Sequence, residues 1–339
     1  MPRIRVLVVD DSAFARKVMR EVLTGAGMEV VGIARDGLEA LEKIEELKPD
    51  VITLDLVMPN LDGLGVLAAL PASRTPRVVV VSMAGEDSAL GVAALQAGAI
   101  QVVQKPTAQA TDRLYELSSE LVAAVRAAGV ARVPRPAEAS EISRLQPPKA
   151  TTRSIVVIGA STGGPQALSR LLKALPGNLP LPVALVLHLP VGYTQPFAQR
   201  LDKECDLEIV EAEDGIELRG GRVLVARAGI HLKLQKSGGT AHAVLDPQPS
   251  GSAHRPSVDV LFESAAGIYG AGVLGVVLTG MGDDGLQGAR RIRAAGGQIL
   301  TESEASCVVY GMPRSIDEQG LSTASVGIDA MAQEILNRL

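Results

Sequence analysis

Short apolar runs, each followed by a stretch with helical spacing, recur along the first part of the chain and strongly constrain its fold. The runs read IRVLVVDD, EVVGIA, VITLDL, RVVVVSM and AIQVVQK, all within residues 1–128. Their apolarity is continuous rather than alternating, which is typical of parallel strands that are covered on both faces. Between them, apolar residues such as Phe14, Val18 and Val22 are spaced four apart and give a helix one buried face. Five such units predict a flavodoxin-like (βα)5 domain, which is a doubly wound α/β fold.

A second block of similar runs follows a stretch that has no periodicity. Residues 129–152 gather proline, serine and charge, so we expect an interdomain linker there. Within residues 153–339 the strand candidates are SIVVIG, VALVLH, LEIVEA, RVLVAR, GVLGVVLTG and QILTES. Residues 207–246 contain strands without long helices between them. The sequence therefore predicts a second doubly wound α/β domain with a parallel sheet and a β-hairpin insertion.

Composition excludes several classes of protein. A net charge of −5 argues against general affinity for nucleic acids or anionic membranes. The two cysteines, Cys205 and Cys307, argue against a disulfide framework or a four-ligand zinc site. No apolar run approaches the roughly 18 residues of a membrane-spanning helix, and the N-terminus lacks the pattern of a secretory signal. We expect a cytoplasmic protein with no membrane insertion and no nucleic-acid partner.

Polar side chains follow four of the strands predicted in the first domain, at the point where each strand ends. They are Asp10, Asp11, Asp55, Ser82 and Lys105. Parallel strands bring their carboxyl ends to one edge of the sheet, where ligands bind. Adjacent carboxylates repel one another unless a cation joins them, and an oxygen-rich site of this kind suits Mg²⁺. Any one of these residues alone is most simply a solvated loop residue, but together they predict a site for Mg²⁺ and a phosphoryl group.

Residues 3–126 resemble the receiver domains of bacterial response regulators. The resemblance rests on the motifs VVDDS, DLVMPNLDG, VVVVS and AGAIQVVQKP. It implies that Asp55 accepts a phosphoryl group from a histidine kinase. It also implies that Asp10, Asp11, Asp55 and the backbone carbonyl of Val57 hold Mg²⁺.

The same resemblance implies that Ser82 and Lys105 contact the phosphoryl oxygens. Receiver domains often place an aromatic switch residue three positions before this lysine. Val102 occupies that position here, which puts an aromatic switch in doubt.

A glycine-rich turn follows the first strand of the second domain, in the stretch SIVVIGASTGGPQAL at residues 154–168. A dinucleotide site needs glycine where Ser161 stands, and an acidic residue about twenty positions later, where the next strand instead ends in His188. A phosphate-binding loop of the Walker type would end in Gly-Lys-Ser/Thr, and this stretch has no such ending. The G-x-S-x-G pattern favours Ser161 as a nucleophile. By itself, however, a serine at the start of a helix is more often an N-cap.

A serine nucleophile needs a histidine base within hydrogen-bond reach. His188 ends the strand that follows the serine's own unit, which places it at the same sheet edge. His231, in GIHLKL, is expected to be structural, and His242, which alternates with apolar residues in AHAVLD, is expected on the surface of a sheet. His254, in HRPSVD, opens a helix and could line a cleft.

The base in turn needs an orienting carboxylate. Asp283 and Asp284 follow a third strand, in GVVLTGMGDDGLQGARRI. They stand where a helix begins, so helix capping is about as good an explanation for them as catalysis. With an aspartate at this third strand end, the sequence offers a Ser–His–Asp set at one sheet edge.

Residues 153–339 resemble the catalytic domain of the chemotaxis protein-glutamate methylesterases, the CheB family. The motifs are IGASTGGP, LHLPVGYTQPFAQRL, HRPSVDVLF, LTGMGDDGLQG and SCVVYGMP. The resemblance implies that Ser161 is the nucleophile, His188 the base and Asp284 the orienting carboxylate. It implies that the backbone N–H of Met281 helps to bind the oxyanion.

A receiver joined to this domain implies a phosphorylation-activated enzyme. It would hydrolyse glutamate γ-methyl esters on chemoreceptors and release methanol, and some family members also deamidate receptor glutamines. Its partners would be methylated chemoreceptors and a chemotaxis histidine kinase, with no cofactor in the esterase site. Two alternatives are a phosphorylation-gated receptor-binding module without esterase activity and a generic serine esterase. A DNA-binding response regulator is disfavoured by the acidic charge and the α/β second domain.

Overall fold

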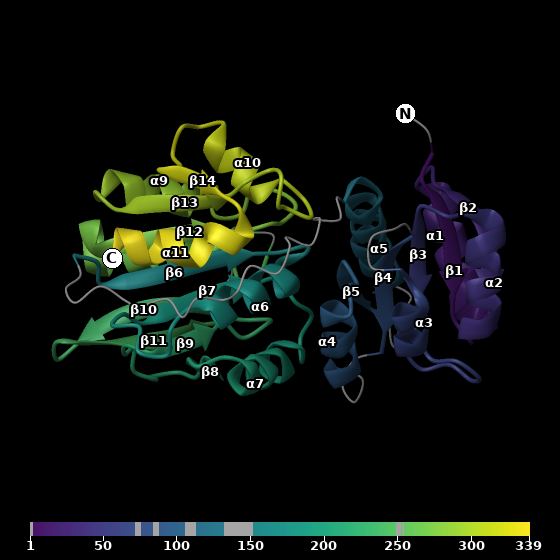
Figure 1. Ribbon diagram of the computed structural model, residues 1–339, viewed down its shortest axis with the longest axis horizontal. Helices are drawn as coiled ribbons and strands as arrows, with labels where there is room; N and C mark the ends of the chain where they lie inside the picture. The colour runs from purple at the N-terminus through teal and green to yellow at the C-terminus, as the bar shows by residue number, and fades with distance from the viewer. Residues whose placement is uncertain are drawn as a thin grey trace. The chain divides into compact units, whose positions relative to one another are not determined.

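Two α/β units follow one another along the chain (Figure 1). The computed structural model describes residues 3–71, 76–83, 88–105, 113–131, 152–248, 252 and 254–339, without the side chains of 113–117. The units comprise Met1–Val133 and Pro134–Leu339. The predicted linker at 129–152 falls almost wholly outside the described residues, although the helix before it continues to Val130, two residues beyond the predicted domain end. The exact domain limits therefore stay a prediction.

The first unit alternates strands and helices, as predicted. Its described elements are β1 (Arg5–Val9), α1 (Ala13–Gly25), β2 (Glu29–Ala34), α2 (Gly37–Leu47), β3 (Val51–Leu54), α3 (Gly63–Ala69), β4 (Arg77–Ser82), α4 (Ser88–Gln96), β5 (Gln101–Gln104) and α5 (Arg113–Val130). The strands pair in parallel in the order β2-β1-β3-β4-β5. This order is that of flavodoxin-like sheets, which confirms the predicted fold class of the first domain. Val51–Leu54 is buried along its whole length, as expected for a central strand covered by helices on both faces.

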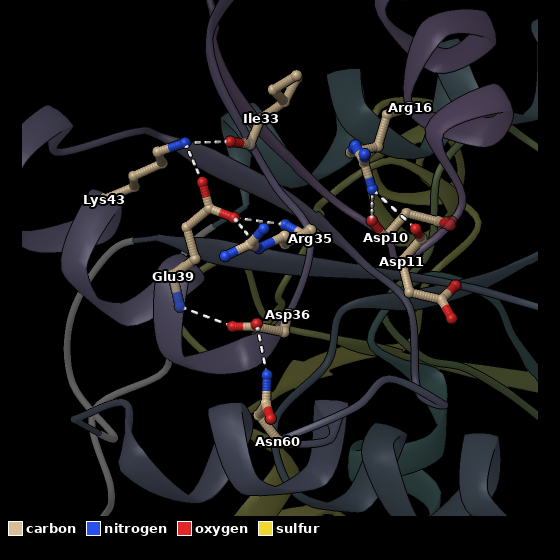
Figure 2. A network of polar contacts seen from close by, with 9 residues as sticks. All are labelled: Asp10, Asp11, Arg16, Ile33, Arg35, Asp36, Glu39, Lys43 and Asn60. Atoms are coloured by element: carbon tan, nitrogen blue, oxygen red, sulfur yellow. Dashed lines mark hydrogen bonds and ion pairs between the residues drawn. The ribbon is translucent and has the colours of Figure 1, made fainter.

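A polar network ties α2 to the loop that follows β3 (Figure 2). Asp36 accepts hydrogen bonds from the Glu39 backbone N–H and the Asn60 side-chain amide, each at 2.9 Å. These bonds lower the pKa of Asp36. Asn60 has a φ of +65°, in the left-handed region that asparagine tolerates better than most residues. The Asp36–Asn60 contact therefore anchors the loop between Asp55 and α3 to the start of a neighbouring helix.

The second unit is built on a larger parallel sheet. Its first described elements are β6 (Ile155–Ala160), α6 (Gly164–Ala174), β7 (Val183–Leu187), α7 (Thr194–Glu204), β8 (Glu208–Glu211), β9 (Arg222–Val225), β10 (His231–Ser237) and β11 (Thr240–Asp246). The chain continues with α8 (Val258–Tyr269), β12 (Val273–Val277), α9 (Leu286–Ala294), β13 (Gln298–Glu302), α10 (Met312–Asp317), β14 (Ala324–Val326) and α11 (Ile328–Arg338). The strand order is β14-β13-β12-β6-β7-β9-β8, and each pair is parallel. The doubly wound parallel fold is confirmed.

The region predicted as a hairpin insertion divides into two parts. β8 and β9 join the main sheet in parallel and form its edge, whereas β10 and β11 form a separate antiparallel hairpin. Leu232 and Ala243 of the hairpin share an apolar core with Phe262 of α8. The hairpin insertion is thus confirmed for residues 231–246 only.

The direction of winding reverses between β6, the central strand of this sheet, and its neighbour β12. From β6 the chain passes to β7 on one side, while β12 and β13 lie on the other side. In open parallel sheets such a reversal leaves a crevice at the carboxyl ends of the strands, where ligands bind. Ser161 directly follows β6, so it lies at this position. No helix among the described residues is long and apolar enough to span a bilayer.

Candidate functional site

Asp10 and Asp11 after β1, Asp55 after β3 and Lys105 after β5 meet at one edge of the first sheet. The Lys105 ammonium lies 2.8 Å from Oδ2 of Asp10 and 2.6 Å from Oδ2 of Asp55. Asp10 and Asp55 are buried, and Asp11 is exposed. Arg16 holds the loop after β1 by donating to the backbone carbonyls of Asp10 and Asp11 (Figure 2). The predicted cluster is therefore assembled around one lysine.

Burial and charge act in opposite directions on these groups. Burial raises the pKa of Asp55, and Lys105 opposes the rise without cancelling it. Burial alone would lower the pKa of Lys105, but its hydrogen bonds to Asp10 and Asp55 outweigh that effect and raise the pKa. Lys105 is therefore held as a cation between two carboxylates. A positive charge fixed beside Asp55 suits the binding of an anionic group there.

The carboxylates offer a ligand set that fits Mg²⁺. One oxygen from each of Asp10, Asp11 and Asp55 lies within 4.8 Å of the others. Mg²⁺ prefers oxygen ligands and usually keeps several of its waters. Three carboxylates, one of them the exposed Asp11, match this preference. Val57 stands two residues after Asp55, and its N–H approaches Asp55 Oδ1 at 3.5 Å. The part assigned to its carbonyl stays a prediction.

The remaining predicted residues of this site end the neighbouring strands. Ser82 is buried at the end of β4, and its carbonyl accepts the Lys105 N–H at 2.7 Å. The contacts of Ser82 and Lys105 with a phosphoryl group stay predictions. Val102 occupies the position at which receiver domains often have an aromatic switch residue, and it is only 1% exposed within β5.

Three polar side chains of the second unit form a hydrogen-bonded row at its sheet edge. Ser161 follows β6, His188 follows β7, and Asp284 lies between β12 and α9. The Ser161 Oγ is 3.1 Å from Nδ1 of His188, and Nε2 of His188 is 2.9 Å from Oδ2 of Asp284. This is the geometry of a serine nucleophile, its base and an orienting carboxylate.

Asp284 is held by four donors. Besides His188, it accepts the Ser257 hydroxyl at 2.8 Å and the backbone N–H groups of Val258 at 2.8 Å and Asp259 at 3.1 Å. Burial works to raise the pKa of Asp284, but His188 and these N–H groups outweigh it and lower the pKa to about 2. Asp284 is therefore an anion that orients His188 and also caps the N-terminus of α8.

The capping explanation of Ser161 is wrong. The N-cap of α6 is Gly163, with a φ of +78° and no side-chain cap. A Cβ at Gly163 would lie 2.5 Å from Val308, so the turn needs glycine for space as well as for conformation. The tight turn leaves the Ser161 hydroxyl facing His188. Asp283 is exposed, and the N-cap of α9 is Gly285, so neither aspartate caps α9 with its side chain.

The loop after β12 lies against Ser161. The Ser161 N–H donates to the Thr279 carbonyl at 3.0 Å, and a Cβ on Gly280 would meet the Ser161 Cβ at 2.8 Å. Met281 follows, 44% exposed, and among the described residues its N–H has no acceptor. A free backbone N–H beside the serine is the group that an oxyanion needs. Its assignment to the oxyanion stays a prediction.

A model of the CheB methylesterase family matches residues 156–335, and a model of the response regulator receiver domain matches residues 6–116. The chain belongs to the CheB methylesterase family. It is 63% identical over 333 residues to protein-glutamate methylesterase/protein-glutamine glutaminase 5 of Myxococcus xanthus, covering 97% of this chain and 96% of the relative. The protein-glutamate methylesterase/protein-glutamine glutaminase of Thermotoga maritima is 41% identical over 320 residues, which are 94% of this chain and 93% of the relative.

A solved structure supports this assignment. The crystal structure of the Thermotoga maritima CheB methylesterase catalytic domain matches with a TM-score of 0.54 and 38% sequence identity. The match covers 56% of this chain and 100% of that domain. The methylesterase fold of the second unit is therefore supported independently of the sequence motifs.

The structure adds two residues to the site that sequence reasoning left without a role in this CheB protein. The His254 ring stacks on His188, with centroids 4.1 Å apart and ring planes 17° apart. Burial and the nearby His188 lower the pKa of His254, which favours its neutral form. Ser257 binds Asp284. Both lie in the HRPSVD motif, so the motif was the available signal, but its contacts depend on tertiary packing. His231 is buried, as expected for a structural residue, and His242 is half-buried on the hairpin, as expected for a residue on a sheet surface.

Proposed function

We propose that this protein is a phosphorylation-activated protein-glutamate methylesterase that hydrolyses glutamate γ-methyl esters on chemoreceptors and releases methanol. The observation that carries the proposal is the unbroken row of Ser161, His188 and Asp284. The family and the names of the relatives support the substrate class. The protein would act in the cytoplasm, without a nucleic-acid partner and without inserting into a membrane.

The row supports acyl transfer in which the serine becomes esterified. The Nε2–H of His188 donates a hydrogen bond to Asp284, so the Nδ1 lone pair faces Ser161 and can take its proton. Ser161 Oγ attacks the ester carbonyl, and the Met281 N–H donates to the oxyanion. His188 gives this proton to the methoxy oxygen as the C–O bond breaks, and methanol leaves. His188 then takes a proton from a water molecule whose oxygen attacks the acyl carbon, and it passes that proton to the Ser161 Oγ as the glutamate side chain is released.

The same acyl intermediate would form from a glutamine side chain, with ammonia in place of methanol. The relatives' names include protein-glutamine glutaminase. We therefore include receptor glutamine deamidation in the proposed activity. Ammonia is the harder group to expel, so we expect the slower rate for glutamine.

The receiver domain regulates the esterase activity. Asp55 accepts a phosphoryl group from a chemotaxis histidine kinase, and Ser82 and Lys105 contact its oxygens. Asp10, Asp11, Asp55 and the Val57 carbonyl would hold Mg²⁺, which would supply positive charge beside the phosphoryl group. The proposal assigns residues 1–128 to the receiver, 129–152 to a linker and 153–339 to the methylesterase domain.

The test is methanol release from methylated receptor fragments, with and without acetyl phosphate as a small phosphodonor. Wild type is compared with Ser161→Ala and with Ser237→Ala, a control at an exposed position of β10. We expect methanol from wild type and Ser237→Ala, increased by the phosphodonor, and a loss on the order of 10⁶ in turnover for Ser161→Ala. No methanol from wild type carrying phosphorylated Asp55 would favour the binding module. Hydrolysis of small esters without receptor hydrolysis would favour a generic esterase.

A further inference from the structure

Glu302 is a fully buried carboxylate close to the triad but outside it. It is 0% exposed at the end of β13, which pairs with β12 up to Val277 and Thr301. Its Oε2 accepts the Thr279 backbone N–H at 2.8 Å, and its Oε1 accepts the Ser306 hydroxyl at 2.9 Å. Burial raises its pKa. A carboxylate is costly to bury, so its position calls for an explanation.

Thr279 transmits this contact to the nucleophile. Its N–H is bound to Glu302, and its carbonyl accepts the Ser161 N–H at 3.0 Å. Its hydroxyl donates to the Thr162 carbonyl at 3.0 Å and accepts the Val309 N–H at 2.9 Å. A single residue therefore stands between Glu302 and the turn that carries Ser161.

The next residue completes the support of the loop. The Gly280 N–H donates to the Val309 carbonyl at 3.0 Å, and its carbonyl accepts the N–H groups of Gly311 at 3.0 Å and Met312 at 2.9 Å. The backbone groups of Thr279 and Gly280 are thus all bound. Within the described part of the chain, the N–H of Met281 stays without an acceptor. The two residues before Met281 are therefore held through their backbone N–H and carbonyl groups, and they fix the position from which the Met281 N–H projects.

We propose that Glu302 is a positioning residue: by binding the Thr279 N–H, its buried side chain fixes the loop that sets the Met281 N–H relative to Ser161. The inference rests on the proposed function, since it assigns the Met281 N–H to the oxyanion. Without Glu302, the Thr279 N–H at this buried position loses its acceptor, and the loop must shift to satisfy it. A displacement of about 1 Å in a reacting group lowers turnover about a hundredfold.

The test uses the full chain with Glu302→Ala, Glu302→Gln and Glu302→Asp. The amide oxygen of Gln still accepts the Thr279 N–H, and its NH₂ group can donate to Ser306. Asp keeps the charge but is shorter by one methylene. Glu304→Ala is the matched control, because Glu304 is an exposed glutamate two residues further along the chain. Each variant is assayed for kcat and KM of methanol release, and for the rate at which a fluorophosphonate labels Ser161.

We expect Glu302→Ala to lower kcat and the labelling rate about a hundredfold, with KM within about twofold of wild type. Glu302→Gln should retain most of both rates, Glu302→Asp should be slower than Glu302→Gln, and Glu304→Ala should match wild type. Wild-type values of kcat and labelling rate in Glu302→Ala would overturn the inference, and so would equal losses in Glu302→Ala and Glu302→Gln. If Glu302→Ala does not fold, equal rates in Glu302→Asp, Glu302→Gln and wild type would overturn it. If the fluorophosphonate labels Ser161 of wild type but no methanol is released, the proposed function is contradicted. The inference about Glu302 is still tested in that case, by the labelling rates of wild type and the Glu302 variants.

Discussion

The Nε2 atom of His188 lies 2.9 Å from Oδ2 of Asp284, and its Nδ1 atom faces Ser161. An ionised carboxylate can only accept a hydrogen bond, so the imidazole proton stays on Nε2. Nδ1 is then the acceptor that faces the serine hydroxyl. Asp284 thereby selects the tautomer that can act as a base, and its own bonds to Ser257, Val258 and Asp259 keep it from turning away.

Asp284→Asn should abolish this selection while keeping the shape of the site. The asparagine NH₂ group can donate to Nε2, which moves the proton to Nδ1 and leaves His188 unable to accept the serine proton. A loss of about 10⁴ in kcat is expected, the size seen when a triad aspartate becomes asparagine. Methanol release measures it, with the exposed neighbour Asp283→Asn as the control. A loss below tenfold, or an equal loss in both variants, would contradict the role of Asp284.

The His254 ring should contribute to turnover through its stacking on His188. Stacked aromatic pairs contribute about 0.5–1.5 kcal/mol beyond the area that they bury. If that energy holds the His188 ring in its reactive orientation, His254→Ala should lower kcat about two- to tenfold. His254→Phe keeps a ring in place and should recover most of the rate. His242→Ala on the hairpin serves as the control, and equal losses in Ala and Phe would show that the stack does not matter.

The triad was predictable because it depends on topology. Continuous apolar runs predicted parallel strands, and parallel strands bring Ser161, His188 and an aspartate to one edge. The choice between Asp283 and Asp284 could not be made from spacing alone, because it depends on which carboxylate faces Ser257 and the first turn of α8. The same holds for His254 and Glu302, whose partners lie 66 and 23 residues away.

Local sequence patterns predicted secondary structure less reliably where one pattern is compatible with several local structures. A serine before a helix indicates an N-cap, yet a glycine at φ +78° performs that role here, because only glycine fits beside Val308. The runs at β8 and β9 lack a helix between them, and this pattern also occurs in a hairpin. Their parallel pairing beside β7 depends on tertiary contacts. β14, only three residues long, has too short a pattern to predict.

Asp55→Asn should abolish the response to a phosphodonor. Asparagine cannot form the acyl phosphate, although it fits the space between Asp10 and Lys105. The measurement is the ratio of methanol release with and without acetyl phosphate and Mg²⁺, which should fall to about one. Asp62→Asn, which keeps an acceptor for the Gly65 N–H at the start of α3, is the control and should keep the wild-type ratio. An undiminished ratio in Asp55→Asn would exclude Asp55 as the phosphoryl acceptor.

Asp259 should make folding stability fall as pH rises through about 6. Burial raises the pKa of Asp259 from 3.8 to about 6, although its Oδ1 accepts the Gly288 N–H at 2.7 Å. The folded state therefore binds the proton more tightly than the unfolded chain does. The stability that this gives is fully present below about pH 4 and is lost as the carboxyl ionises near pH 6.

Asp259→Asn removes the titration and keeps an acceptor for the Gly288 N–H. Thermal unfolding of the full chain from pH 4 to pH 8 should show wild type losing stability relative to the variant by about 1 kcal/mol, a value reduced for the partial exposure of Asp259. The difference between the two curves is the relevant quantity, because other titrating groups contribute equally to both. The difference should develop between about pH 4 and pH 6 and stay constant above pH 7. A constant difference across the whole range would mean that Asp259 is ionised in the folded protein at every pH tested.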